Sequence, residues 1–162
     1  MLHYILQVIF SILPDTRSYS FKRFVLRLRG YTIGSNVRIV SSVKLKIKKL
    51  SIGENTFIGF DTLIASGSGK VTIGKNVDIA PRCNIIGGTH EMGGMIHRAG
   101  KGISLDIVIG DGTWIGTNVT IIGGVCIGRG CVVAAGSVVR NDIPDNVLIA
   151  GVPAEIIRYL PV

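Results

Sequence analysis

The sequence has few aromatic residues. Phe, Trp and Tyr together make up 6% of its 162 residues, and only one of them is Trp. A compact globular core normally uses more rings. Hydrophobic residues nonetheless make up 47% of the chain, and there are 22 glycines. These numbers predict one domain with an aliphatic core and many tight turns, because glycine favours such turns.

Cysteine is also scarce. The chain contains three cysteines, Cys83, Cys126 and Cys131, which is an odd number without the spacing of metal ligands. The count argues against a disulfide framework and against a cysteine-based metal site. We expect all three to be small buried side chains in a reducing compartment, since free cysteine is among the most buried residue types.

Acidic residues are nearly absent from the first third of the chain. Residues 1–50 contain ten Lys or Arg and a single acid, Asp15, whereas residues 51–162 contain eight bases and nine acids. The basic character therefore belongs to the N-terminal region, so we do not expect a basic body that wraps nucleic acid. The uneven charge predicts a local anionic neighbour, either a membrane surface or an acidic partner.

The apolar N-terminal segment, residues 2–13, is short. Its 12 residues fall well below the ~20 that a helix needs to span a bilayer. It also lacks the basic start and the small-residue cleavage site of a secretory signal. We therefore expect neither a transmembrane helix nor a signal peptide here, and a cytoplasmic protein.

A second short helix is predicted after Pro14, with Asp15 or Thr16 as its N-cap and Gly30 at its end. Within "SFKRFVLRLRG", apolar residues recur at helical spacing, and basic residues occupy the other faces. The predicted apolar face consists of Phe21, Phe24, Val25 and Leu28.

Residues 1–30 are thus predicted to form a helical segment separate from residues 31–162. Two interpretations of this segment stay open. The helices could cover the open end of the body that follows, whose edge would otherwise be unpaired. Alternatively, residues 1–29 could lie on a membrane, with apolar faces among the headgroups and cations on anionic lipid.

From residue 33 an aliphatic residue returns about every six positions, as in "IGSNVR", "IGENTF", "IGKNVD" and "IGDGTW". The repeat is interrupted only at about residues 91–102, which we predict to be a loop excursion. A period of six fits neither a helix nor a simple strand. If three units close one triangular coil, the leading aliphatic residues point inward and stacked coils form parallel sheets. The spacing does not determine the hand of the coil.

The motifs "IGDGTWIG", "AAGSVV", "DIP" and "AGVPA" follow one another in the second half of the chain. In this order they resemble the hexapeptide-repeat acyltransferases, specifically the maltose, galactoside and polysaccharide O-acetyltransferase branch. The resemblance covers roughly residues 31–160. It implies an all-β fold, the left-handed parallel β-helix, and a homotrimer. It also implies acetyl transfer from acetyl-CoA, without a required metal, at sites between neighbouring subunits.

His90 is the leading candidate for a catalytic base. It ends the repeat unit "IIGGTH" beside the Gly-rich interruption, and a histidine pKa near neutrality suits proton removal from an attacking hydroxyl. The resemblance implies the same role for the His of this "TH" pair. It further implies that the backbone amide of Thr117 stabilises the oxyanion of the tetrahedral intermediate.

The resemblance also assigns a wall for coenzyme A, made of small residues, one aromatic ring and a late basic residue. Arg140 could assist in binding its phosphates, although the family does not usually carry Arg there. Glu155 departs from the family, whose sugar acetyltransferases carry a base at this position. The matching wall residues are Trp114, Gly116, Thr117, Ala134, Ala135, Gly136 and Arg158.

The acceptor side is less well defined. Candidate contacts to the substrate are Asp61, Glu91 and His97, but the disaccharide specificity of the family is not carried over. A neutral histidine base works best when its second nitrogen is held by an acceptor. That acceptor could be a backbone carbonyl or the carboxylate of Asp61, Asp78 or Glu91.

We therefore expect an acetyl-CoA-dependent O-acetyltransferase acting on a sugar hydroxyl of a surface polysaccharide or its precursor. N-acetylation of an amino sugar or of a small xenobiotic is an alternative that shares the same base. A non-catalytic β-helical scaffold is a second alternative. A zinc hydrase of this fold would need three His ligands at an interface, whereas the repeat body has only His90 and His97.

Overall fold

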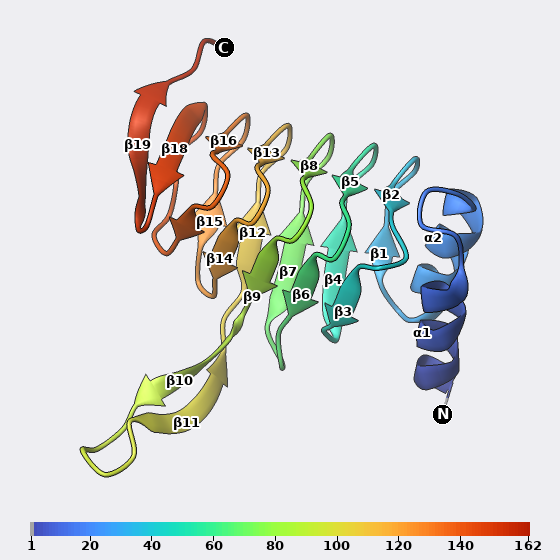
Figure 1. Ribbon diagram of the computed structural model, residues 1–162, viewed down its shortest axis with the longest axis horizontal. Helices are drawn as coiled ribbons and strands as arrows, with labels where there is room; N and C mark the ends of the chain where they lie inside the picture. Colours follow the sequence, from blue (N-terminus) through green and yellow to red (C-terminus); the bar gives the residue numbers. More distant parts are fainter. Residues whose placement is uncertain (1) are drawn as a thin grey trace.

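The computed structural model describes residues 2–162, which form a rod of stacked coils with a helical cap at one end and a projecting hairpin (Figure 1). Three parallel sheets run along the rod. The first sheet contains β1 (Thr32–Ile33), β4 (Lys49–Ile52), β7 (Lys70–Ile73), β12 (Ile107–Ile109) and β15 (Cys126–Ile127).

The second and third sheets complete each coil. The second contains β2 (Arg38–Ile39), β5 (Phe57–Ile58), β8 (Asp78–Ile79), β13 (Trp114–Ile115), β16 (Val132–Val133), β18 (Val147–Gly151) and β19 (Ala154–Tyr159). The third contains β3 (Lys44–Lys46), β6 (Leu63–Ala65), β9 (Asn84–Ile86), β14 (Thr120–Ile122) and β17 (Val138–Val139). The only antiparallel pairs among the described strands are β18 with β19 and β10 with β11. The predicted parallel β-helix is confirmed.

The core consists of three ladders of aliphatic side chains, one inside each sheet. Each side chain stacks on its partner in the next coil, for example Ile58 on Ile79 and Ile79 on Ile115. The six-residue repeat predicted these inward positions except Leu45 and Ile149, and all of them are buried. The ladders are Ile33, Ile52, Ile73, Ile109 and Ile127; Ile39, Ile58, Ile79, Ile115, Val133 and Ile149; and Leu45, Ile64, Ile85, Ile121 and Val139.

The chain turns between sheets through residues in the left-handed region of backbone conformation. Asn76 (φ 53°) and Gly130 (φ 62°) turn from the first sheet to the second, and Asn118 (φ 56°) turns from the second to the third. Asn and Gly tolerate this conformation better than other residues. Coils also approach closely beside these corners, since a Cβ on Gly110 would lie 2.5 Å from the carbonyl carbon of Gly128.

The interruption is a β-hairpin rather than a loop. It covers residues 88–104, so the predicted bounds of about 91–102 were too narrow. β10 (Gly88–Met92) pairs with β11 (Ala99–Ser104), and together they project away from the rod (Figure 1). The coil already ends at Gly87, whose N–H donates to the Ala65 carbonyl and whose carbonyl accepts from Leu105 N–H, both at 2.8 Å. Small residues fit the repeat pattern and a hairpin equally well. The pattern therefore assigned all of "IIGGTH" to the coil, although its last three residues belong to the hairpin. We call residues 88–104 the arm.

Two helices cover the first coil. α1 (Leu2–Ile12) packs on α2 (Tyr19–Leu28), and Leu6, Phe10, Val25 and Leu26 enter the core. None of the described helices combines the length and the apolar character that crossing a membrane requires. The packing of α1 and α2 on the first coil confirms the interpretation that the helices cover the open end of the rod.

The cap also satisfies backbone groups at the open end of the rod. Arg27 Nε and Nη2 donate to the Ile33 carbonyl at 3.0 and 2.7 Å, and Arg23 Nη1 donates to the Val37 carbonyl at 3.1 Å. These carbonyls belong to the first coil, which has no preceding coil to pair with. Part of the N-terminal positive charge therefore has a structural role.

The predicted apolar face of α2 was largely wrong. Of its four residues only Val25 is buried, while Phe21, Phe24 and Leu28 are each about half exposed. Lys22, expected on an exposed face, is 1% exposed. Its Nζ donates to the carbonyls of Pro14 and Asp15 at 2.7 and 2.6 Å, and burial lowers its pKa. Helical periodicity alone does not predict a buried lysine, because the two carbonyls that accept from its ammonium group come together only in the folded chain.

The start of α2 also differs from expectation. Ser18 occupies the N-cap position, without a side-chain hydrogen bond, in place of Asp15 or Thr16. The Asp15 carboxylate instead accepts from the backbone N–H of Ser42 at 2.9 Å. Asp15 therefore ties the link between the helices to the first coil.

Two of the three cysteines follow the prediction. Cys83 and Cys131 are buried, and burial raises the pKa of both thiols. Cys126 is exposed, so the prediction was wrong for this residue. It directly precedes the inward-facing Ile127 in β15, and alternation along a strand places its side chain on the outer face.

Candidate active site

One corner of the rod gathers most of the predicted wall for coenzyme A. Gly116 and Thr117 follow β13, and Ala134, Ala135 and Gly136 follow β16 in the next coil. The N–H of Gly136 donates to the Thr117 carbonyl at 2.9 Å, which stacks the two turns. A Cβ on Gly116 would lie 2.7 Å from Ala135 N. The corner thus offers backbone groups with few side chains covering them.

The backbone N–H of Thr117 is free, in contrast with two amides at the equivalent place in the preceding corner. After the first sheet, Lys75 N–H donates to Asp111 Oδ1 at 2.8 Å and Arg129 N–H donates to Asp145 Oδ1 at 2.7 Å. Thr117 occupies the same place in its corner, directly before the left-handed residue. Within residues 2–162 no acceptor receives its N–H. This amide is therefore available to a ligand.

Phe60 and Ala135 occupy the same corner position in other coils, and neither of their N–H groups has an acceptor within the described chain. A free amide at this position is thus not unique to Thr117. Thr117 is distinguished by its surroundings, since the exposed indole of Trp114 lies three residues before it and small residues follow in the next coil.

Trp114 stands on the outer face of the second sheet, 56% exposed. It pairs with Asp78 on one side and Val132 on the other. The row continues from Val132 to Leu148 and from Leu148 to Arg158. The structure therefore brings the predicted Trp114 and Arg158 onto one face, although 44 residues separate them in the sequence.

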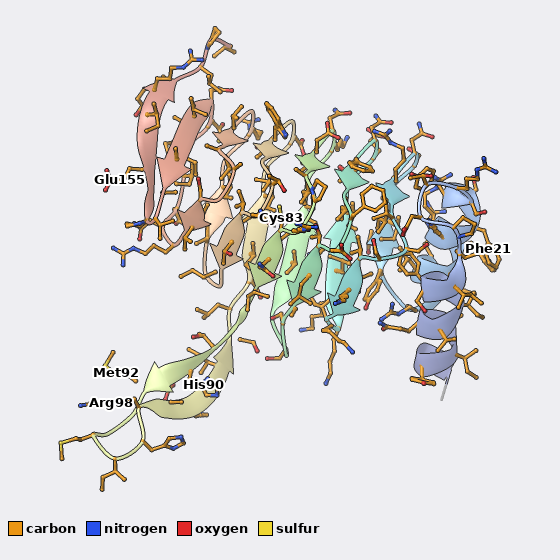
Figure 2. All side chains as sticks on the ribbon, in the orientation of Figure 1. Phe21, Cys83, His90, Met92, Arg98 and Glu155 are labelled. Atoms are coloured by element: carbon orange, nitrogen blue, oxygen red, sulfur yellow. The ribbon has the colours of Figure 1, made fainter. Side chains whose placement is uncertain are left out.

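Two residues considered for this wall lie elsewhere. Arg140 follows β17 in the third sheet, so it stands at the far end of that sheet from the Thr117 corner. Glu155 lies on β19 opposite Ala150, exposed at the outer edge of the second sheet (Figure 2). Neither residue is in the row of Trp114.

His90 lies on the arm, well away from the body of the rod (Figure 2). It pairs with Gly102 across the hairpin, and a Cβ added to Gly102 would lie 3.8 Å from His90 Nε2. The imidazole is therefore exposed above a residue without a side chain. The hairpin holds its backbone by strand pairing, where a coil edge had been predicted.

The arm also carries two of the predicted substrate residues. Glu91 follows His90 in β10, where the pairing of the hairpin is irregular between His90 and Met92. His97 lies in the turn at the tip, where its backbone N–H donates to the Gly94 carbonyl at 3.1 Å. Both side chains are exposed.

Asp61 belongs to the same corner column as Thr117, two coils earlier, where its N–H donates to Ser42 Oγ at 3.3 Å. Asp78 lies beside Trp114. Among the described residues, no hydrogen bond joins the His90 imidazole to Asp61, Asp78 or Glu91. The acceptor that orients His90 stays undetermined within one chain.

A small cavity of about 130 Å³ lies at the base of the arm. The sequence did not predict this cavity, because the residues that line it follow the six-residue repeat like their neighbours. Its lining residues are Ile86, Gly88, Thr89, Ile122 and Gly123. Within residues 2–162, no group of three or more His, Cys, Asp or Glu side chains is arranged to hold a metal ion.

One chain does not bring His90 and Thr117 together. The arm leaves the rod at the end of the third sheet, whereas Thr117 lies at the turn that enters this sheet. The third sheet therefore separates the base of the arm from the Thr117 corner. The two predicted catalytic groups face solvent at different edges of the rod.

Comparisons with known proteins agree with this architecture. Residues 106–141 match the family model described as bacterial transferase hexapeptide (six repeats), and residues 49–80 match the hexapeptide repeat of succinyl-transferase. Galactoside O-acetyltransferase of Escherichia coli is 38% identical over 130 residues, which cover 80% of this chain and 64% of that enzyme. The chain thus spans somewhat less than two thirds of the length of that relative.

Two further relatives match over more of their length. WcaF of Escherichia coli, named for acetyl transfer in colanic acid biosynthesis, is 36% identical over 144 residues, or 86% of this chain and 75% of WcaF. The hexapeptide-repeat acetyltransferase VCA0836 of Vibrio cholerae, solved with acetyl coenzyme A, superposes with a TM-score of 0.87 at 31% identity. The match covers 99% of this chain and 86% of that chain. The fold is the left-handed parallel β-helix, and the chain belongs to the hexapeptide-repeat acetyltransferase family.

Proposed function

We propose that the chain is an acetyl-CoA-dependent O-acetyltransferase that modifies a sugar hydroxyl of a surface polysaccharide or its precursor. The observation that carries the proposal is the free N–H of Thr117 beside the exposed Trp114. Relatives named for O-acetylation of galactosides and for acetyl transfer in colanic acid biosynthesis support the reaction and the sugar acceptor. The acetyl coenzyme A complex of the Vibrio cholerae relative supports the donor.

The reaction requires three groups to act together. Neutral His90 removes the proton from the acceptor hydroxyl as its oxygen attacks the carbonyl carbon of the thioester. The carbonyl oxygen becomes an oxyanion, which accepts a hydrogen bond from the Thr117 N–H. The carbon–sulfur bond then breaks, the acetyl group stays on the sugar oxygen, and the imidazolium returns its proton to the departing thiolate.

The separation of the two groups within one chain supports a site built between copies. The arm extends His90 beyond its own rod, while the Thr117 corner lies open on the face of the second and third sheets. A neighbouring copy of the rod could supply that corner to the arm. We therefore propose a homotrimer with three equivalent sites, in which cyclic symmetry repeats this contact at each interface.

The cavity at the base of the arm is our proposed position for part of the acceptor. It lies next to Thr89, the residue before His90, and its walls combine Ile86 and Ile122 with glycine backbone. A sugar ring presents apolar C–H faces as well as hydroxyls, so aliphatic walls and exposed backbone suit it. Glu91 and His97, farther along the arm, are proposed contacts to the rest of the glycan.

Replacing His90 with Ala removes the proposed base while leaving the backbone pairing of the arm in place. We expect the release of thiol from acetyl-CoA, with sugar acceptors present, to fall by at least about 10²-fold. The matched control is Met95→Ala, at the tip of the same arm, where Met95 is 82% exposed; this variant should retain most of the activity. Turnover by His90→Ala equal to that of the unmodified chain would exclude His90 as the base.

Replacing Thr117 with Pro removes the proposed oxyanion donor. The backbone should accept proline, because Pro81 occupies the same corner position one coil earlier, directly before Arg82 (φ 62°). Loss of one such donor typically lowers kcat by about 10²–10³-fold. Thr117→Ala is the control, since it keeps the N–H and removes only the hydroxyl that donates to the Pro81 carbonyl at 2.8 Å. Equal kcat values for the two variants would contradict the assignment.

The outer face of the helical cap supports a second, separate proposal, peripheral contact of residues 1–29 with an anionic membrane. Tyr4 and Ile12 on α1 are each 74% exposed, and Phe24 on α2 is 54% exposed. Phe21 lies on the side of α2 away from the rod (Figure 2) and stacks on Phe24 at 6.3 Å. Apolar side chains with nearby cations are typical of helices that lie in a membrane interface.

Sedimentation with phosphatidylglycerol-containing vesicles measures this contact. The full chain should sediment with the vesicles, and the double substitution Phe21→Ser with Phe24→Ser should release it, since it removes apolar area from the outer face of α2. Met92→Ser on the arm, where Met92 is 89% exposed, is the matched control and should not release it. If the double variant sediments as fully as the unmodified chain, this surface does not bind the membrane.

A further inference from the structure

Arg29 is a buried cation, and no carboxylate of the described residues pairs with it. It directly follows α2, is 9% exposed and stacks over the Tyr31 ring at 5.0 Å. Its Nη2 donates to Gln7 Oε1 at 3.0 Å and to the Leu45 carbonyl at 3.5 Å. Its Nε has no acceptor within residues 2–162. The ion pairs of the described chain, Lys75 with Glu54 and Arg129 with Asp145, do not include Arg29.

Such an arrangement is costly. Buried charges in proteins are normally paired, and a guanidinium does not escape the cost by losing its proton. Asp15, the single acid of residues 1–50, is engaged by the Ser42 N–H. A counter-anion for Arg29 must therefore come from outside the described chain.

A cavity next to Arg29 has room for such an anion. It measures about 500 Å³ and is lined by Arg29, Tyr31, Ile47 and Lys48. Lys48 is exposed and supplies a second positive charge. Tyr31 donates its hydroxyl proton to the Ile47 carbonyl at 2.8 Å, so its ring is fixed as one wall. The volume lies within the range of sites for small organic ligands, about 300–1,000 Å³.

We propose that this cavity binds a phosphate monoester, with the phosphate between Arg29 and Lys48 and the organic part against Tyr31 and Ile47. A phosphate monoester carries about −1.5 to −2 charges near neutral pH, which matches two cations better than one carboxylate would. Arg suits phosphate because its N–H groups fit two phosphate oxygens at once. The ester group belongs either to a soluble sugar phosphate or to a lipid phosphate.

This site is distinct from the proposed active site, and the inference goes beyond the proposed function. Tyr31 lies directly before β1, and Ile47 and Lys48 lie between β3 and β4, so the cavity belongs to the first coil under the cap. Trp114 and Thr117 lie three coils farther along the rod, on β13 and at the turn after it. Binding at the cavity is therefore measurable without any acetyl transfer.

Titration calorimetry of the full chain with glucose 1-phosphate tests the proposal, and coenzyme A is left out because it carries a phosphate monoester of its own. Lys48→Gln should weaken binding by about tenfold, the size expected for losing a charged hydrogen bond. Lys49→Gln removes the neighbouring exposed lysine, which does not line the cavity, and should leave the affinity unchanged. Arg29→Met should abolish binding; if that variant fails to fold, Lys48→Gln carries the test alone.

A second arm of the experiment identifies the source of the phosphate. Vesicles of phosphatidylcholine with phosphatidic acid present the same monoester on a lipid, and pure phosphatidylcholine vesicles are the blank. Binding of glucose 1-phosphate, or of phosphatidic acid vesicles alone, supports the site and assigns a soluble or a lipid source respectively, provided that Lys48→Gln weakens it and Lys49→Gln does not. Absence of both bindings, or equal effects of the two lysine substitutions, overturns the proposal.

Discussion

The filled interior of the rod is the constraint on which the rest of the structure depends. Each coil places three aliphatic side chains inward, and strand pairing stacks them on those of the next coil, about 4.8 Å away. The inside of the rod therefore holds no site for a ligand. Chemistry has to use the outer faces, the corners between sheets, or segments that leave the rod, and all candidate residues lie in these places.

The corners show how one repeated backbone acquires different roles. The same amide position receives a carboxylate in one corner column, at Lys75 and Arg129, and stays free in the next, at Thr117. At Arg129 the partner is Asp145, whose pKa is lowered by hydrogen bonds from the Arg129 amide and guanidinium. A change of one side chain in the following coil thus decides whether a corner is closed for stability or open to a ligand.

The sequence predicted the parts of the fold that follow from the repeat, because an inward aliphatic residue every six positions leaves little freedom. The sequence did not predict the structure correctly where one sequence pattern is compatible with two ways of packing the chain. The α2 stripe of Phe21, Phe24 and Leu28 has helical spacing, yet Lys22 and Leu26 fill the interface, since the helix was rotated to meet carbonyls that only the tertiary structure provides. In "IIGGTH", small residues allowed the chain to leave the coil at Gly87.

Parts of the candidate site were likewise predicted from the sequence, and other parts were not. The family resemblance assigned Trp114, Thr117 and residues 134–136 to one wall, and the structure stacks them at one corner. The proximity of Arg158 arises from the pairing of β18 with β19 and could be expected only from the family resemblance. The cavities at Arg29 and at the base of the arm had no sequence signal, because they result from how the cap and the arm meet the coils.

The central claim is that His90 of one copy acts with the Thr117 corner of another. Mixing His90→Ala and Thr117→Pro chains, each inactive alone, under conditions where subunits exchange measures this directly. The account predicts that acetyl transfer reappears in about a quarter of the sites at equal mixing, because a random interface unites one intact group of each kind at that frequency. Mixed oligomers that form and stay as inactive as the separate variants would contradict it.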